Sequence, residues 1–359
     1  MSDYLKNLDI EIFQNDLINW YNQVKRDLPW RKNLDPYQIL VSEIMLQQTQ
    51  VSTVIPYYER FMALFPTTKE LAKTDETTLL KAWEGLGYYS RARNLQKSAQ
   101  MIEEIGHFPA THAEILKLKG VGPYTAGAIA SIAFSVPAPA VDGNVFRVIS
   151  RVCCIFCDIM KPKTRKTFEN VVAQLISIDN PGDFNQGLME LGATICKPKS
   201  PKCLECPIQS HCKAYQQGID DQLPVKSKAV KQTKIKLVVG IIENQHGEML
   251  IEKRDSQGLL ANFYEFKTFE YEGGLEPSEI LYQKLMQNGY KVEAIRHLGI
   301  FSHIFTHRIW EMDSYRVNVH MDSDTKEQGI WIKLEDLPNY PLAVAHVKIL
   351  RQLAHGVCE

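Results

Sequence analysis

Four of the eight cysteines have the spacing of metal ligands, Cys196-x6-Cys203-x2-Cys206-x5-Cys212. Disulfides do not suit a cytosolic chain, and four thiolates this close together indicate a metal centre instead. Both Zn²⁺ and iron–sulfur clusters accept four cysteines. Spacing alone does not decide between the two, although zinc sites more often use two Cys-x2-Cys pairs and only one occurs here.

Glu43 is a second candidate for chemistry because it falls beside the apolar stripe of an expected helix. Asp35–Pro36 favours a helix start, with an N-cap residue followed by proline in the first turn. An ionised carboxylate near a core is costly unless it is paired or its pKa is raised. A cap or an ion pair with a neighbouring helix is the simpler explanation of an isolated glutamate.

Gly120-x-Gly122 separates an expected helix ending near Leu118 from a second one predicted over 124–134. Glycines permit a tight turn with positive φ and leave the backbone N–H groups uncovered. Such amides, together with a helix N-terminus, can bind the phosphates of a duplex. A tight turn chosen for its geometry alone is the alternative.

Asp142 follows in the stretch Val141–Asp142–Gly143–Asn144–Val145. The hairpin and this stretch together resemble the helix-hairpin-helix, Gly/Pro and aspartate signature of the DNA glycosylase superfamily that includes endonuclease III. Within that superfamily the chain is similar to the adenine DNA glycosylases, the MutY family, which share the run 42–50 around Glu43. The resemblance extends from about Leu17 to the C-terminus.

The resemblance implies a multidomain fold. We expect an all-α helix-hairpin-helix glycosylase region over 1–222, which includes a [4Fe–4S] loop at 196–212. A lysine-containing linker is expected at 223–235 and an α+β, Nudix-like lesion-recognition domain at 236–359. Periodicity in that last domain predicts a hairpin from 236–242 and 248–253, strands at 315–321 and 330–334, and helices at 277–287 and 342–353. The region near 276–289 lacks the glutamate-rich helix that holds Mg²⁺ in Nudix hydrolases, so we expect binding and not hydrolysis.

The implied activity is monofunctional removal of adenine paired with 8-oxoguanine or G in duplex DNA. Glu43 would be the general acid at adenine N7, and Asp142 would stabilise the oxocarbenium ion or bond transiently to C1′. Asn144 would support Asp142, and Tyr124 would lie beside the sugar. Endonuclease III has a lysine at the position of Tyr124 and forms a Schiff base there, which a phenol cannot do.

The family's DNA contacts match further residues of this chain. Each of these residues, taken alone, would more often be a core-packing or surface residue. Its adenine-pocket positions match Arg26, Trp30, Arg31 and Gln186. Its wedge, which fills the gap left by the extruded base, matches Gln48, Leu86 and Tyr88. Gly120 and Gly122 would contact the backbone. Phe301, Ser302 and His303 match a loop that reads the base opposite adenine, although the residues themselves favour a half-buried strand.

The distribution of charge gives modest support for a DNA-binding region at the front of the chain. The net charge is −1, yet residues 1–234 carry 28 Lys and Arg against 24 Asp and Glu, which makes the front the better partner for phosphate. No apolar run is long enough to span a membrane, so we expect the protein in the bacterial cytosol or nucleoid. We also expect a monomer. The alternatives are an endonuclease III-like glycosylase/lyase for damaged pyrimidines and a non-catalytic, DNA-binding iron–sulfur redox sensor.

Overall fold

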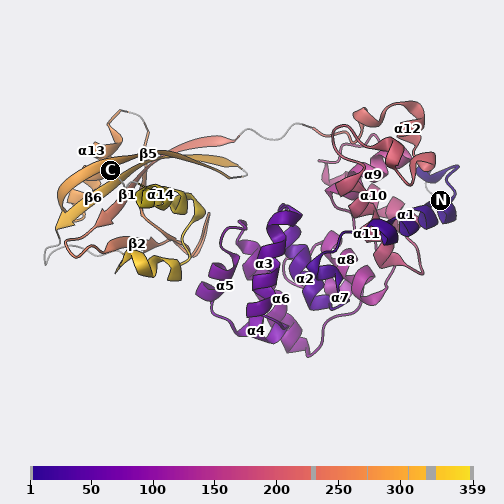
Figure 1. The fold of residues 1–359 in the computed structure, drawn as a ribbon, viewed down its shortest axis with the longest axis horizontal. Helices are drawn as coiled ribbons and strands as arrows, with labels where there is room; N and C mark the ends of the chain where they lie inside the picture. Colours follow the sequence, from indigo (N-terminus) through magenta and orange to yellow (C-terminus); the bar gives the residue numbers. More distant parts are fainter. Residues whose placement is uncertain (1–2, 228–231, 273, 306, 321–328, 356–359) are drawn as a thin grey trace. The chain divides into compact units, whose positions relative to one another are not determined.

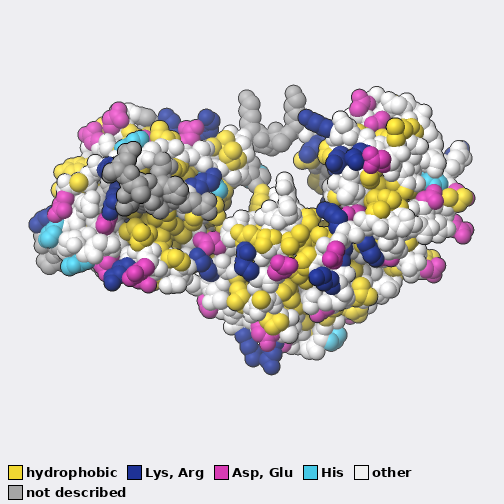
Figure 2. Space-filling model, viewed as in Figure 1, with side chains coloured by type: hydrophobic (Ala, Val, Ile, Leu, Met, Phe, Trp, Pro, Cys, Tyr) yellow, Lys and Arg dark blue, Asp and Glu magenta, His cyan; other side chains and the backbone are white. Residues whose placement is uncertain are grey.

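The computed structural model describes residues 3–227, 232–272, 274–305, 307–320 and 329–355. The chain divides into two compact units, residues 1–74 with 90–228 and residues 75–89 with 229–359 (Figure 1). Residues 228–231, in the middle of the expected linker, lie outside the described part. On the face drawn in Figure 2, Lys and Arg side chains are interspersed with Asp and Glu, in keeping with the near-zero net charge.

The first unit is helical, as the sequence predicts. Its core lies where α11 packs against α1, α8 and α9, with Phe13, Leu17, Phe184 and Leu188 fully buried. Each such side chain contributes about 1.5–3 kcal/mol by leaving water. The helices of this unit are α1 (Ile10–Val24), α2 (Pro36–Leu46), α3 (Val51–Leu64), α4 (Thr68–Lys73), α6 (Ser90–Ile105), α7 (His112–Ile115), α8 (Pro123–Phe134), α9 (Gly143–Cys153), α10 (Pro162–Leu175), α11 (Pro181–Thr194) and α12 (Lys213–Gln217).

The expected helix-hairpin-helix is formed by α7, the turn at 116–122 and α8. Gly120 has φ +77°, and a Cβ there would lie 2.6 Å from Cβ of Asn94, so glycine is required. The expectation of positive φ is wrong for Gly122, which has φ −96° and ψ 177° as the N-cap of α8. Apart from its chain neighbours and its own helix, no heavy atom of the described residues lies within 4 Å of the place where its Cβ would be. The space beside Gly122 is therefore open, and neither φ nor packing requires glycine there.

The second unit contains α5 (Glu76–Trp83) and a mixed sheet. The sheet order is β3-β2-β1-β6-β5, with β4 also paired to β1 and β7 to β2. One face is covered by α14 and the other by α13, which buries Leu281 and Leu285. Its elements are β1 (Thr233–Glu243), β2 (Met249–Lys253), β3 (Tyr264–Glu265), β4 (Lys267–Glu270), α13 (Pro277–Gln287), β5 (Lys291–Ile304), β6 (Arg308–His320), β7 (Ile330–Ile332) and α14 (Val344–His355).

The strand pairing differs from the simple hairpin expected of β1 and β2. These strands are antiparallel but are registered through the pair Glu243–Met249 alone. The long neighbours of β1 are β6, which is parallel over the whole of β1, and β4. The last strand is also shorter than expected, because a 3-10 helix begins at Leu334. Among the described residues, no helix is both long and apolar enough to cross a membrane.

Candidate active site and metal centre

A cavity of about 730 Å³ opens in the first unit between α2, α8, α9 and α11. Two helix starts help to form it, because Asp35 caps α2, as expected, and Asp142 caps α9. The site residues expected from the sequence that line this cavity are Arg26, Trp30, Arg31, Glu43, Gln48, Tyr124, Asp142, Asn144 and Gln186.

Glu43 is buried, with only 6% of its surface exposed. The Tyr124 hydroxyl donates a hydrogen bond to its Oε2 at 2.5 Å. Burial raises the pKa of Glu43 to about 7, helped by the charge of Asp142 and opposed by the Tyr124 hydrogen bond and by Arg31. A carboxyl group with this pKa is partly protonated at neutral pH and can donate a proton.

Asp142 is the N-cap of α9. Its Oδ1 accepts from the backbone N–H of Val145 at 2.7 Å, and its Oδ2 accepts from Asn144 Nδ2 at 2.9 Å. Burial raises the pKa of Asp142, while these hydrogen bonds oppose the rise. The carboxylate is therefore fixed in direction by the helix N-terminus and by the hydrogen bond from Asn144.

Asn185, which the sequence analysis did not single out, holds the segment that leads to Asp142. Its Oδ1 accepts from the N–H of Ala140 at 3.2 Å, and its Nδ2 donates to the carbonyl of Ala138 and to Ser131 Oγ, both at 2.9 Å. Asn185 is fully buried. The amide thereby ties the irregular chain between α8 and α9 to α11.

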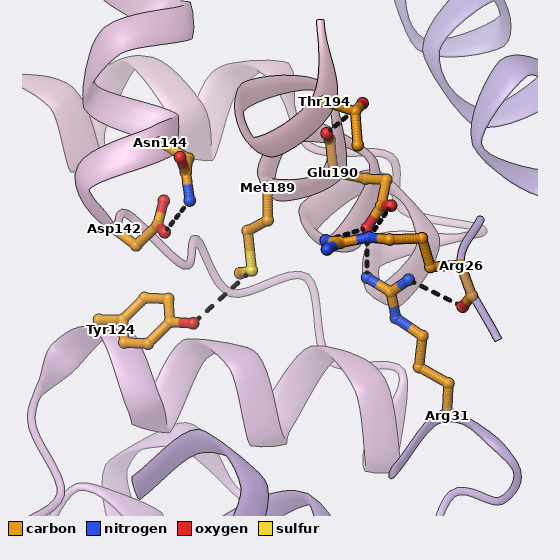
Figure 3. A network of polar contacts seen from close by, with 8 residues as sticks. All are labelled: Arg26, Arg31, Tyr124, Asp142, Asn144, Met189, Glu190 and Thr194. Atoms are coloured by element: carbon orange, nitrogen blue, oxygen red, sulfur yellow. Dashed lines mark hydrogen bonds and ion pairs between the residues drawn. The ribbon is translucent and has the colours of Figure 1, made fainter. Parts of the chain in front are cut away.

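Glu190 is a second residue that sequence reasoning missed. Arg26 Nε donates to its Oε1 at 2.5 Å, and Arg31 Nη2 donates to its Oε2 at 2.8 Å (Figure 3). Burial would raise the pKa of Glu190, but these hydrogen bonds and the two guanidinium charges lower it. The available signal was a single carboxylate in the apolar run 188–191, one helical turn after Gln186.

The three expected wedge residues differ in placement. Gln48 lines the cavity with φ +58°, and Tyr88 has φ +47° with 47% of its surface exposed. Left-handed backbone at a residue other than glycine is strained and is commonest at functional sites. Leu86 is buried, and neither it nor Tyr88 is among the residues that line the cavity.

Phe301, Ser302 and His303 lie in the second unit, on the edge strand β5, rather than in a loop. Ser302 is exposed, whereas Phe301 and His303 are half-buried, as expected for alternate residues of a strand. Nδ1 of His303 is buried and makes no hydrogen bond within the described chain. Its ring packs on Phe305 at 4.6 Å between centroids, and burial lowers its pKa.

The four expected metal ligands, Cys196, Cys203, Cys206 and Cys212, line one small cavity of about 30 Å³ and form no disulfide. Over the described residues, no three His, Cys, Asp or Glu side chains are close enough to bind a single metal ion. Four cysteine thiols around one space are a donor set that an iron–sulfur cluster accepts.

Two arginines of α9 surround the first of these ligands. Arg151 Nη1 donates to Cys196 Sγ at 3.2 Å, and Arg147 Nε donates to the Cys196 carbonyl at 2.7 Å. Arg147 also donates through Nη2 to Asn144 Oδ1 at 2.9 Å. A single guanidinium thus contacts both the cysteine loop and the residue that supports Asp142.

Three family models match the chain. Residues 41–174 match the HhH-GPD superfamily base excision DNA repair protein, and residues 238–352 match a NUDIX domain. Residues 196–212 match the iron-sulfur binding domain of endonuclease III. The cysteine cavity is therefore an iron–sulfur site, and the helical and sheet units have the two folds expected from the sequence.

Similar proteins cover nearly the whole chain. The adenine DNA glycosylase of Rattus norvegicus is 37% identical, over 98% of this chain and 80% of that one. That of Schizosaccharomyces pombe is 33% identical, over 96% and 90%. Among solved structures, a thermostable thymine-DNA glycosylase has a TM-score of 0.53 and 30% identity, over 59% of this chain and 99% of that one. A non-covalent endonuclease III–DNA complex, at 24% identity, shares the fold with a TM-score of 0.50, over 61% of this chain and 99% of that one. The chain thus belongs to the adenine DNA glycosylase family.

Proposed function

We propose that the protein removes adenine paired with 8-oxoguanine or guanine from duplex DNA without cutting the strand. The observation that carries this proposal is the pairing of two buried carboxyl groups of different surroundings in one cavity. Glu43 receives a single side-chain hydrogen bond and has a pKa of about 7, whereas Asp142 caps a helix and accepts two hydrogen bonds. This difference in surroundings supports Glu43 as the proton donor and Asp142 as the ionised carboxylate.

The reaction follows from these two groups. Protonated Glu43 donates its proton to N7 of the extruded adenine as the C1′–N9 bond breaks and its electron pair passes to the base. Ionised Asp142 stabilises the oxocarbenium ion at C1′, or bonds to it transiently. Water then attacks C1′, and the Glu43 carboxylate accepts its proton. Tyr124 holds Glu43 through the hydroxyl and offers no amine for a Schiff base, which separates this activity from a lyase.

The residues proposed to contact DNA belong to both units, and each set is taken by itself. Trp30, Gln186 and the Arg26–Glu190–Arg31 group would surround the adenine, and Gln48, Leu86 and Tyr88 would fill the space that it leaves. Gly120 and Gly122 would meet the backbone. Ser302 and His303 would read the opposite base, because 8-oxoguanine differs from guanine by an oxygen at C8 and a donor at N7.

We assign a [4Fe–4S] cluster to the four cysteines, in a monomer of the cytoplasm, where thiols remain reduced. When bound, such a cluster would link the four thiolates and stiffen residues 196–212. The exposed Lys197, Lys199 and Lys202 of this loop would then present positive charge to the DNA backbone. We also propose that residues 223–235 connect a catalytic region over 1–222 to a lesion-reading domain over 236–359.

One assay tests the proposal against its alternatives. A duplex with A opposite 8-oxoguanine is incubated with the protein and then analysed with and without hot alkali, beside a duplex with A opposite T. We expect strand breaks only after alkali and only in the first duplex. Breaks without alkali would indicate a lyase, and intact DNA bound by the protein would indicate the non-catalytic alternative.

The matched variant is Glu43→Gln, which keeps the shape of the side chain but cannot donate the proton. General acid catalysis is typically worth about 10²–10⁴-fold. We expect the single-turnover excision rate of the variant to decrease by a factor in that range, while its binding to the duplex persists. Excision at the wild-type rate would remove Glu43 from the mechanism.

A further inference from the structure

Arg165, on the first turn of α10, is a cation of the catalytic cavity that the proposed chemistry does not use. Its Nη1 donates to the carbonyl oxygen of Val141 at 3.0 Å, directly before Asp142 in the chain. Its guanidinium carbon lies 5.2 Å from the centre of the Phe146 ring. The guanidinium is thus held from two sides next to the segment that bears the catalytic aspartate.

The charge of Arg165 is only weakly compensated. Glu169, one turn further along α10, lies 3.5 Å from Nη1, and the Arg165 side chain is 41% exposed. The pair joins neighbouring turns of one helix, and such pairs contribute little when one partner is open to solvent. By contrast, Arg26 and Arg31 both form ion pairs with the buried Glu190.

The surroundings of Arg165 add positive charge on the outside. Lys161, Lys163 and Lys166, on the same turn of chain, are exposed. Inside the cavity, the lining carboxylates of Asp142 and Asp183 would repel a polyanion.

We propose that the Arg165 guanidinium binds a phosphate of the nucleotide whose base is removed. This inference rests on the proposed function, because it takes Asp142 as the group that faces C1′. The 5′ and 3′ phosphates of a nucleotide are attached to the same sugar ring as C1′. A cation anchored beside Asp142 is therefore close to where one of these phosphates would lie. The planar fork of arginine suits a phosphate, and the remaining N–H groups can donate while Nη1 stays bonded to Val141.

The test combines a variant with a modified substrate. Binding of Arg165→Gln is measured over a salt series on a duplex whose target carries 2′-fluorodeoxyadenosine, which resists cleavage. Loss of one phosphate contact should lower the slope of log affinity against log salt by about one. Loss of a hydrogen bond to a charged group should lower the affinity of Arg165→Gln for this duplex by about tenfold to a hundredfold. Arg165→Lys, which keeps the charge, should retain the salt slope.

Methylphosphonates identify the phosphate. Neutralising the contacted one, on the 5′ or the 3′ side of the target, should weaken the wild type as much as Arg165→Gln does and should not weaken the variant further. Lys69→Gln removes an equal charge from α4, which does not line the cavity, and should keep the full methylphosphonate penalty.

Two outcomes would overturn the inference. A methylphosphonate penalty that is as large in Arg165→Gln as in the wild type at both phosphates would show that the side chain makes no such contact. Slower excision by Arg165→Gln with an unchanged salt slope would show that Arg165 only positions the Val141 segment and does not bind phosphate. If the wild type shows the expected coupling but releases no adenine, the proposed function fails while the phosphate contact stands.

Discussion

Tyr124→Phe gives the sharpest test of how the cavity sets the acidity of Glu43. The substitution removes the hydroxyl that donates to Glu43 Oε2 at 2.5 Å and leaves the ring in place. This hydrogen bond stabilises the ionised carboxylate and lowers a pKa that burial raises to about 7. Without it, the pKa of Glu43 should rise further.

The magnitude follows from the strength of the contact. A hydrogen bond to a charged group contributes about 1.5–3 kcal/mol, and one pKa unit corresponds to about 1.4 kcal/mol. The pKa of Glu43 in Tyr124→Phe should therefore lie about one to two units above the wild-type value. In the proposed mechanism excision needs the protonated form, so activity that falls near pH 7 in the wild type should persist to about pH 8–9 in the variant.

The measurement is the single-turnover excision rate between pH 5 and about pH 10, with DNA binding checked at each pH. The titration belongs to the coupled pair of Glu43 and Asp142, so its midpoint is an apparent value. Tyr37→Phe is the control, because it removes a buried hydroxyl that donates to the carbonyl of Phe65 outside the cavity. An alkaline limb in Tyr124→Phe that is unmoved, or moved to lower pH, would refute this reasoning.

Four further predictions follow from other contacts. Cys203→Ser should lose the brown absorbance of the cluster and bind DNA more weakly; unchanged absorbance would argue against the four-cysteine site. Ser302→Ala combined with His303→Ala should lower the preference for A opposite 8-oxoguanine over A opposite G by roughly a few-fold to a hundredfold, whereas equal loss on both substrates would make this part of β5 structural. Asn185→Ala, which leaves buried groups unpaired at about 1–3 kcal/mol, should lower both the melting temperature and the single-turnover rate on bound DNA; a lower melting temperature with an unchanged rate would show that the amide does not position the catalytic aspartate. The pKa of Glu43 is higher in the folded protein than in the unfolded chain, so the neutral side chain favours folding. Its contribution to the free energy of unfolding is complete below pH 4.5 and is lost as pH rises through about 7. Urea unfolding at pH 8 should consequently show Glu43→Gln to be more stable than the wild type, and a less stable variant would contradict the raised pKa.

Local signals predicted the helices well. Asp35 and Pro36 mark the start of α2 because the side chain of the first caps the helix that the second begins. The predicted helix 277–287 coincides with α13. Both boundaries depend on residues adjacent in sequence, which is why single-sequence reasoning finds them.

Contacts between distant parts of the chain were less accessible. Arg26 and Glu190 are 164 positions apart, and the ion pair between them has no local signature. The parallel pairing of β1 with β6 likewise joins segments about 75 residues apart, whereas the turn at 244–247 favours the neighbouring hairpin. Periodicity correctly indicated a strand at Phe301–His303, and only its position on the sheet edge required the fold.

The close packing around Asp142 also bears on how natural sequence changes in this chain should be read. A Cβ at Gly192 on α11 would lie 2.5 Å from Cβ of Asn144, and a Cβ at Gly127 on α8 would collide with the carbonyl of Pro139. Glycine to alanine is usually ranked among the mildest replacements. At these two positions it would displace the chain that carries Asp142, the proposed catalytic carboxylate, although neither glycine has a side chain to touch DNA. In a survey of inherited or selected variants, alanine at either place belongs with changes to the active site itself.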